Sequence, residues 1–276
     1  MILGIDHVVI LVEDLDAAQA DYARLGFTVV PGGAHAGGLT QNALIAFADG
    51  SYLELLAFTP PGGAGAPPAG LSALTRTWHG RARSGEGLLD FALLPEAIAA
   101  DIAAAQARGL TLEGPLPGGR RRPDGQEVAW QLALPPAADL PFLCGDVTPR
   151  DLRVPPGPDR QQANGGQGVA GMFVASPDVA TSRARYAALL GPAAPQTADG
   201  QGRPVFTVGG ATITLLSPAQ GDDPLGQQRA AGDARPYALW LRTDPGHSPG
   251  WLDRGRAHGA WIWMAATAPR WADAAQ

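Results

Sequence analysis

The sequence predicts an α+β protein built from a repeated β-α-β-β-β unit. Three observations lead to this prediction: short runs of Ile, Val and Leu with strand character, Ala-rich helical segments that end at glycine, and the return of the same order of elements along the 276 residues. One such unit exposes a sheet face that it cannot bury alone. We therefore expect the units to pair into cup-shaped mixed sheets around a shared cleft.

The first unit takes up about the first sixty residues. It opens with the apolar strand IDHVVILV, and a helix should follow that begins at Asp14 or Asp16 and ends at Gly26. Three short strands separated by Gly-rich turns complete it, at FTVV (27–30), NALIAF (42–47) and SYLELLAF (51–58). A Pro- and Gly-rich stretch at 59–70 should join this unit to the next one.

The second unit repeats this order of elements. The strand GLLDFALLP precedes an Ala-rich helix that ends at Gly109, and a second strand begins at TL (111–112). The turn Pro123-Asp124-Gly125 then precedes a strand in EVAWQLALP. PFLC at 141–144 can supply the last strand.

A third unit begins at Gly168 and aligns directly with the first. Asp178 and Tyr186 match Asp14 and Tyr22 at one constant spacing, and the strand ATITLLSP aligns with SYLELLAF. A fourth unit, with PYALWLRTD, a helix through Gly259 and then AWIWM, should stop short of completion.

A segment rich in Pro, Gly, Asn and Gln separates the second unit from the third. It indicates an interdomain linker at 151–167. We therefore expect a first domain at 1–150 that holds the site, and a second domain at 168–276.

Composition excludes several classes of function. All 20 basic residues are arginine, which rules out Schiff-base lysine chemistry and a Walker-type phosphate loop. The net charge of −6 argues against a nucleic-acid partner, and the single cysteine, Cys144, excludes an internal disulfide. No apolar run is long enough for a membrane span and no signal peptide is apparent, so we expect a cytoplasmic protein without a membrane partner.

Two polar side chains lie within strongly apolar strands. Burying the imidazole of His7 costs free energy unless it is paired, so His7 makes a structural hydrogen bond, holds a metal or contacts a substrate. Glu54 is flanked by Leu53 and Leu55, which alternation places on the opposite face. Its partner could be His7, a metal, an arginine or water.

Other polar and aromatic residues could border a pocket. His35 lies in PGGAHAGG, which is too Gly-rich for a strand interior; it either borders a pocket or lies exposed in a loop. Thr40 and Asn42 could orient a polar ligand or close a turn. Trp130 could be part of the core or the aromatic wall of a pocket.

Arg121 and Arg122 lie beside a tight turn. Each could be solvated, or one could bind a substrate carboxylate with two parallel hydrogen bonds.

The paired units, the opening Asp-His-Val strand and the Leu-Glu-Leu strand together resemble the vicinal oxygen chelate superfamily, which includes glyoxalase I, extradiol dioxygenases and bleomycin-resistance proteins. The segment GG-x-H-x-G…T-x-N, followed by Leu-Glu-Leu and RPDG…W, is similar to the glyoxalase-like domain subgroup over residues 4–150. The resemblance implies the glyoxalase/bleomycin-resistance/dioxygenase fold.

The resemblance also implies a divalent metal, Zn²⁺, Mn²⁺, Ni²⁺ or Fe²⁺, held by residues on the first and last strands of each unit. In this chain those positions give His7 and Glu54, with Asp90 on the first strand of the second unit. The fourth position departs from the pattern because Gly145 stands there.

The third unit departs further from the pattern of the resemblance. Gly171 and Thr214 stand where the first unit has His7 and Glu54, so the second domain should be degenerate. It could support the fold, cover the cleft or form a homodimer.

The leading hypothesis is a glyoxalase-like, metal-dependent isomerase, lyase or hydrolase acting on a small oxygen-rich substrate. Glu54 and His35 would be catalytic, and the substrate would contact Thr40, Asn42, Arg122 and Trp130. Dioxygenation fits less well because it requires two histidines and a carboxylate. The alternative is a metal-free protein that binds or sequesters a cationic small molecule, like the bleomycin-resistance proteins. A third possibility is a relic whose C-terminal half mediates dimerisation.

Overall fold

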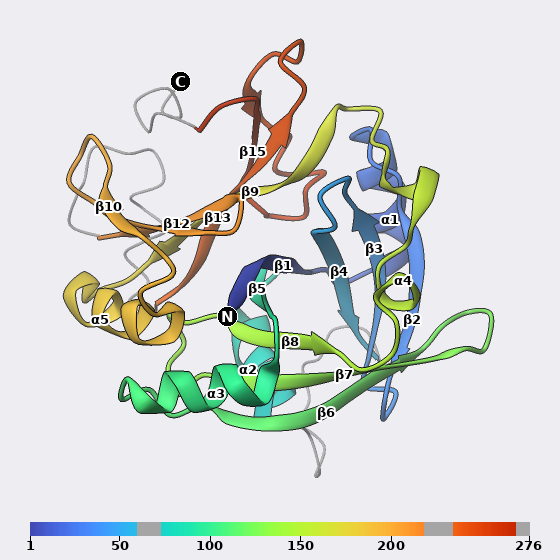
Figure 1. Cartoon of the computed structure of the whole chain (residues 1–276). Coiled ribbons are helices and arrows are strands. Elements are labelled where there is room, and N and C mark those ends of the chain that lie inside the picture. The colour runs from blue at the N-terminus through green and yellow to red at the C-terminus, as the bar shows by residue number, and fades with distance from the viewer. Residues whose placement is uncertain (60–72, 218–233, 269–276) are drawn as a thin grey trace.

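Two β-sheets lie side by side in the computed structural model, which describes residues 1–59, 73–217 and 234–268 (Figure 1). The first sheet is a closed barrel with the strand order β1-β4-β3-β2-β6-β7-β8-β5, and the second is an open sheet with the order β10-β11-β12-β9-β13-β15-β14. The α+β class and the cup formed by repeated units are confirmed. The expected connection at 59–70 falls almost entirely outside the described residues.

The barrel is built from the first two units. The first contributes β1 (Ile2–Leu11), α1 (Leu15–Arg24), β2 (Val30–His35), β3 (Thr40–Ala46) and β4 (Tyr52–Phe58). The second contributes α2 (Ala73–Arg81), the short 3₁₀ helix η1 (Ala82–Ser84), β5 (Gly87–Pro95), α3 (Ile98–Ala107), β6 (Glu113–Arg121), β7 (Glu127–Leu134) and β8 (Phe142–Asp146). β1 pairs with β5, so the two units join within one chain.

The second sheet follows a short connection. The connection holds α4 (Arg150–Arg153) and the 3₁₀ helix η2 (Gly157–Arg160). The sheet and its helix comprise β9 (Gly166–Ala175), α5 (Val179–Leu190), β10 (Gln196–Ala198), β11 (Pro204–Val208), β12 (Ala211–Leu216), β13 (Arg235–Thr243), β14 (Gly250–Trp251) and β15 (Ile262–Ala265). None of the helices in the described ranges is long and apolar enough to cross a membrane.

The predicted helix caps are present in both aligned units. Asp14 Oδ1 accepts hydrogen bonds from the backbone N–H groups of Asp16 and Ala17, both at 3.0 Å. Asp178 Oδ1 accepts one from Thr181 N–H at 3.0 Å. These bonds satisfy backbone donors that have no partner within the first helical turn, which explains why each helix begins there.

The repeat also extends to strand register. His7 on β1 lies opposite Tyr52 on β4, and Gly171 on β9 lies opposite Thr212 on β12. A Cβ atom at Gly171 would lie 3.2 Å from the Trp240 ring, so that indole leaves little room for a larger side chain. The second sheet therefore keeps the register of the first unit, with Gly171 and Thr214 in place of His7 and Glu54.

Two local expectations are wrong. The first expectation is a strand at FTVV and none in the Gly-rich segment PGGAH. In the structure PGGAH belongs to β2, whereas residues 27–29 precede the strand. Gly33 has a φ of +126°, and a Cβ atom there would lie 2.0 Å from the carbonyl oxygen of Arg121. Glycine therefore permits β2 to pair with β6, in the register His35 opposite Arg120, which closes the barrel.

The second is the expected helix through Gly259. Residues 254–259 form consecutive turns instead. His258 and Gly259 both have positive φ values, of 50° and 78°, and a right-handed helix cannot continue through such residues.

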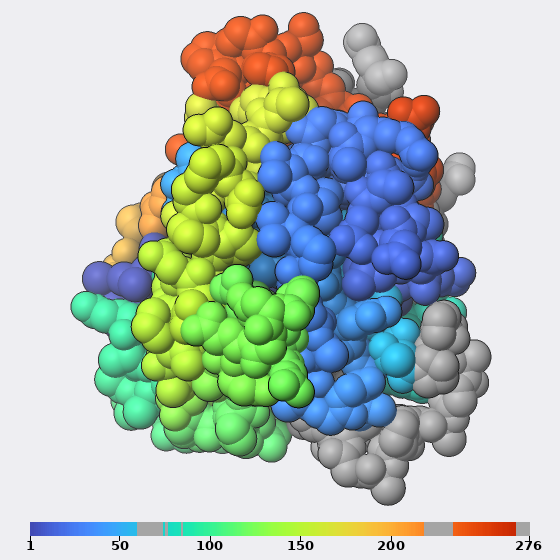
Figure 2. Space-filling model, turned by 90° about the vertical axis from the view of Figure 1, so that its right-hand side faces the viewer, coloured from blue at the N-terminus to red at the C-terminus, as the bar shows by residue number. Residues whose placement is uncertain are grey.

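The segment 151–167 is packed rather than freely extended. Gln162 Oε1 accepts a hydrogen bond from Thr28 N–H at 2.7 Å, and Asn164 Nδ2 donates to Leu25 O at 2.9 Å. Arg153 within it is almost fully buried. Figure 2 shows the segment (yellow-green) lying along the first unit (blue). The domain boundaries on either side of it stay a prediction.

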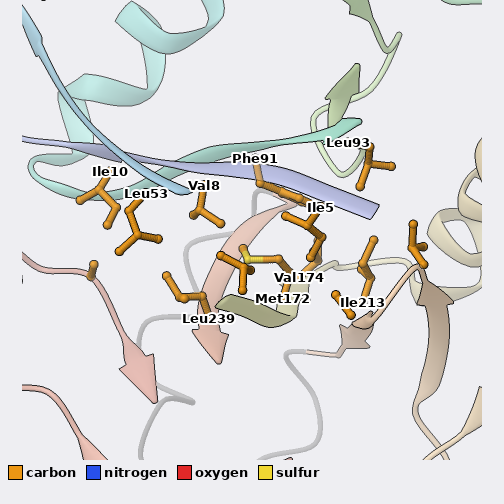
Figure 3. Packing of buried hydrophobic residues seen from close by; sticks show 14 of the residues in the cluster. Ile5, Val8, Ile10, Leu53, Phe91, Leu93, Met172, Val174, Ile213 and Leu239 are labelled. Atoms are coloured by element: carbon orange, nitrogen blue, oxygen red, sulfur yellow. The ribbon is translucent and has the colours of Figure 1, made fainter. Parts of the chain in front are cut away.

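The outer face of the barrel packs on the second sheet. Figure 3 shows apolar side chains of the barrel strands, among them Val8, Ile10 and Leu53, facing Met172 and Leu239 of the second sheet. Because side chains alternate along a strand, this packing directs His7 and Glu54 into the barrel interior. The second sheet therefore covers the barrel strands that carry these two residues.

Candidate functional site

A cavity of about 280 Å³ lies within the barrel. Its polar wall includes His7, Glu54 and Arg120, and its apolar wall includes Trp130 and Phe142. Every predicted substrate contact except Arg122 borders it, since Thr40 and Asn42 are also lining residues. Its volume lies just below the range usual for pockets that bind drug-sized ligands, so the ligand it fits is small.

Glu54 is the centre of the polar wall. Asn42 Nδ2–H donates a hydrogen bond to Glu54 Oε1 at 2.7 Å. His7 Nε2 lies 3.5 Å from Glu54 Oε2, and His35 Nε2 lies 3.5 Å from Oε1. The structure therefore brings both histidines to one buried carboxylate.

His7 is held in place through its other ring nitrogen. Its Nδ1 is 2.6 Å from Asp6 Oδ2, and its ring stacks on Tyr52 with a centroid distance of 4.6 Å. An ionised carboxylate accepts hydrogen bonds only, so Nδ1 carries the hydrogen. In a neutral imidazole, Nε2 then presents a lone pair to Glu54.

His35 is oriented in the same manner. Its Nδ1 is 2.8 Å from Thr40 Oγ1, and its ring packs edge-on against Trp130 at a centroid distance of 5.8 Å. Burial lowers the pKa of His35, although the charge of Glu54 opposes this effect. The ring is therefore neutral near pH 7.

Behind His7 lies a buried ion-pair network. Arg153 Nη1 donates to Asp6 Oδ2 at 2.6 Å and to the Tyr52 hydroxyl at 2.9 Å. Arg153 Nε donates to Asp146 Oδ1 at 2.5 Å, and Arg150 Nη1 pairs with Asp6 Oδ1 at 2.7 Å. The network fixes the carboxylate that in turn fixes His7.

Asp6, His7 and Cys144 form the one group of three potential metal ligands that lie within 4.8 Å of one another in the described part of the chain. A cation there would compete with Arg153 and Arg150, which already pair with the two oxygens of Asp6. Burial raises the pKa of Cys144 to about 12, so the protein alone keeps it a neutral thiol. We therefore interpret Asp6 as the residue that orients His7, and not as a metal ligand.

Asp90 does not border the cavity. Its Oδ2 accepts hydrogen bonds from Trp78 Nε1–H at 3.0 Å and from Arg81 Nη1–H at 3.1 Å, and its Oδ1 accepts one from Phe91 N–H at 2.9 Å. These three donors occupy most of the acceptor sites of the carboxylate, and the Asp90 side chain is not among the lining residues of the cavity. Asp90 is therefore left out of the ligand set that we propose below.

Arg122 also lies outside the lining of the cavity. Its Nη1 donates to the carbonyl oxygen of Leu152 at 3.2 Å, and its Nη2 pairs with Asp124 at 3.1 Å. Arg121 is exposed, with a side-chain exposure of 70%. The arginine at the cavity is Arg120, which precedes both residues that the sequence singled out.

Comparison with known proteins settles the family. A profile described as the glyoxalase-like domain matches residues 5–190, which is more than half of the chain. The chain belongs to this family. The predicted resemblance is thereby confirmed, and the glyoxalase-like match extends through the barrel to α5.

Solved structures share the fold of this glyoxalase-like chain. A hypothetical protein from Staphylococcus aureus has a TM-score of 0.71 at 15% identity, with 94% of this chain and 98% of that chain covered. A mutant 4-hydroxymandelate synthase from Streptomyces coelicolor has a TM-score of 0.52 at 16% identity, with 88% and 72% covered.

A xylose isomerase-like TIM barrel/4-hydroxyphenylpyruvate dioxygenase fusion protein has a TM-score of 0.51 at 16% identity, with 88% of this chain and 37% of that chain covered. No curated protein matches the glyoxalase-like chain in sequence.

Four polar residues of the site were not singled out from the sequence: Asp6, Tyr52, Arg120 and Arg153. Asp6 precedes His7 directly, and an acid beside a histidine within the apolar strand IDHVVILV is a signal visible in the sequence. Arg153 lies in the segment interpreted as a linker, where no sequence pattern marks a buried side chain.

The ion pair between Asp6 and Arg153 predicts a stability that depends on pH. Burial alone would raise the pKa of Asp6, but the charge of Arg153 and the hydrogen bond from His7 hold it well below its ordinary value. Such a group contributes stability that is complete above its unfolded pKa and is lost as the pH falls through its folded pKa. We therefore expect the free energy of unfolding to decrease below about pH 4.

Urea unfolding between pH 7 and pH 3 measures this dependence. Asp6→Asn is the comparison, because it removes the titrating group and should decline less steeply over the same range. Parallel curves for the two proteins would contradict the assignment.

Proposed function

We propose that this protein is a glyoxalase-like enzyme that isomerises, cleaves or hydrolyses a small oxygen-rich substrate with the help of a divalent cation held by His7, His35 and Glu54. The observation that carries the proposal is the placement of two imidazole Nε2 atoms, each 3.5 Å from a different oxygen of the Glu54 carboxylate. The cavity beside these groups would hold the substrate.

The donor types fit such a cation, but the donor atoms of His7, His35 and Glu54 do not all lie within 4.8 Å of one another, so the two histidines would have to move closer together to bind it. Imidazole nitrogen and carboxylate oxygen suit Zn²⁺, Mn²⁺, Fe²⁺ and Ni²⁺. Histidines that bind metals usually have their second nitrogen held by a hydrogen bond, and here Asp6 and Thr40 do so. His7 Nε2 and Glu54 Oε2 are both possible acceptors 3.5 Å apart, and a cation shared by the two would satisfy both of them.

The chain's own residues would position the reactants. When bound, the cation would supply Lewis-acid stabilisation of an enolate-like anion. Asn42 holds the Glu54 carboxylate through Oε1, and its own Oδ1 is buried without a hydrogen-bond partner in the part of the chain described. That oxygen could accept a hydrogen bond from a substrate hydroxyl. Trp130 and Phe142 would exclude water from the apolar side of the cavity.

His35 changes one expectation about the reaction. Dioxygenation fitted the sequence less well because only one histidine was in place. A second histidine beside Glu54 provides two histidines and a carboxylate, the ligand types used by non-haem iron oxygenases. Oxygen uptake by Fe²⁺-loaded protein therefore belongs among the assays for this enzyme.

The second candidate function is metal-free binding of a cationic small molecule. The aromatic wall favours it, because Trp78, Trp130 and Tyr52 all line the cavity near Glu54 and aromatic faces attract cations. Thermal-shift measurements separate the two functions. Stabilisation by a divalent metal supports the enzyme, whereas stabilisation by an organic cation alone supports the binder.

Titration calorimetry of chelator-stripped protein with Mn²⁺ or Zn²⁺ tests the proposal. We expect one bound cation per chain. We also expect His7→Gln, His35→Gln and Glu54→Gln each to weaken binding by about 100-fold or more, since even the loss of a group that supports a ligand costs about 10- to 100-fold.

Two variants are matched controls for this titration. Asp90→Asn changes a buried carboxylate outside the cavity lining, and His247→Gln changes an exposed histidine. Both should bind the cation as the wild type does. Equal affinity in all six proteins, or no binding by the wild type, would contradict the proposal.

A further inference from the structure

Arg120 is a buried cation in the cavity wall that has no acidic partner in the described part of the chain. It belongs to β6 and is only 4% exposed. Among the residues that the structure describes, its side chain makes one hydrogen bond, from Nη2 to the carbonyl oxygen of Arg153 at 2.7 Å. Nε has no hydrogen-bond partner among the described residues. A guanidinium group has five N–H donors, so most of its binding capacity is unused.

The acids near Arg120 are committed to other groups. Asp6 and Asp146 pair with Arg153 and Arg150. Glu54 accepts its hydrogen bond from Asn42 and faces the two histidines. No carboxylate in the described ranges forms an ion pair with Arg120.

Burial also lowers the pKa of Arg120, although the charge of Glu54 opposes this effect. A buried charge without a partner is strongly unfavourable. The missing anion is expected from a ligand.

The surroundings of Arg120 leave space for such a ligand. Gly118, Gly119 and Gly37 border the cavity beside it, and a Cβ atom at Gly37 would meet nothing within 4 Å. A Cβ atom at Gly118 would lie 2.2 Å from Trp130 Nε1, so the indole lies directly on the backbone of β6. The cavity therefore presents an arginine and an aromatic surface next to each other.

We propose that Arg120 binds the carboxylate of the substrate, which is a small organic acid with an apolar group against Trp130 and a second oxygen, hydroxyl or oxo, directed to Glu54. The inference rests on the proposed function in so far as both place the substrate in this cavity. A phosphate ester could also bind arginine. A dianion would face the Glu54 carboxylate in the same cavity, however, so a singly charged carboxylate fits better.

The test compares an acid with its uncharged analogue. The probes are 2-hydroxy-3-phenylpropanoate and its amide, titrated by calorimetry against wild type, Arg120→Met, Arg120→Lys and Arg121→Met. In the wild type we expect the acid to bind at least about tenfold more tightly than the amide. In Arg120→Met the acid should lose about 10- to 100-fold and the preference should disappear.

Arg121→Met is the matched control, because Arg121 is exposed and adjacent in sequence; it should keep the preference. Arg120→Lys keeps the charge without the planar group, so its preference should be intermediate. Circular dichroism reports whether each variant folds, and if Arg120→Met does not, the lysine variant decides. If Arg120 had only a structural role, its substitution would weaken the binding of the acid and of the amide equally.

Three results would overturn the inference. The first is equal binding of acid and amide by the wild type, and the second is an unchanged preference for the acid in Arg120→Met (or in Arg120→Lys, if the methionine variant does not fold). The third is displacement of the acid by inorganic phosphate at a lower concentration than by a second carboxylate. The titrations are run on stripped and on Mn²⁺-loaded protein. An acid preference without metal binding would refute the proposed function and leave this inference standing. Metal binding without an acid preference would refute this inference and leave the proposed function standing.

Discussion

Arg153→Met is expected to lower the free energy of unfolding by about 3–5 kcal/mol. The substitution removes the hydrogen bonds of a nearly fully buried guanidinium to Asp6, Asp146 and Tyr52. Asp6 would stay buried with most of its counter-charge removed, and an uncompensated buried charge is the costly part of breaking such a pair. Urea unfolding near pH 7 measures the change.

Arg150→Met is the matched control. Arg150 pairs with the same carboxylate, yet 27% of its side chain is exposed. Water therefore screens this ion pair, and the loss should be about 1 kcal/mol. Equal losses in the two variants would show that burial of Arg153 is not what makes its pair important.

The same network connects stability to the site. Asp6→Asn would leave His7 Nδ1 without its anionic acceptor, and the imidazole could then rotate or change tautomer. If the proposed cation binds at His7, this variant should also weaken Mn²⁺ binding, by about 10- to 100-fold. Unchanged affinity would show that Tyr52 stacking alone orients the ring.

Sequence reasoning recovered most of the element order because the signals are local. Capping by Asp14 and Asp178, glycines after helices and apolar strand runs depend on neighbouring residues, and the structure confirms them. The strand β2 was not predicted because its glycines are required by the close approach of β6, which is distant in the sequence. Only the approach of Arg121 O to Gly33 shows why a Gly-rich segment pairs as a strand.

The residues of the candidate site also divide into those with a local sequence signal and those without one. His7 and Glu54 stood out because a polar side chain within an apolar strand has an evident free-energy cost. Arg120 and Arg153 did not stand out, since arginines in Gly- and Pro-rich segments are usually solvated. Their burial follows from closure of the barrel and from the packing of α4 against β7, which involve residues far apart in the sequence.

Gly33→Ala is expected to destabilise the protein by about 3 kcal/mol, through two effects of roughly 1–3 kcal/mol each. The φ of +126° is strained for any residue with a Cβ atom, and that atom would overlap Arg121 O at 2.0 Å. The pairing of β2 with β6 would have to open, and it joins the cavity residues His35 and Arg120. Both the free energy of unfolding and the affinity for small acids should fall.

Gly37→Ala separates the two effects. Gly37 lies two residues beyond β2 with a φ of +88°, but a Cβ atom there would meet nothing within 4 Å. It should therefore cost only the conformational part, about 1 kcal/mol, and leave the barrel closed. Urea unfolding measures both variants. Similar losses for the two would mean that the barrel tolerates a wider separation of β2 and β6, and that its closure does not depend on the close approach at Gly33.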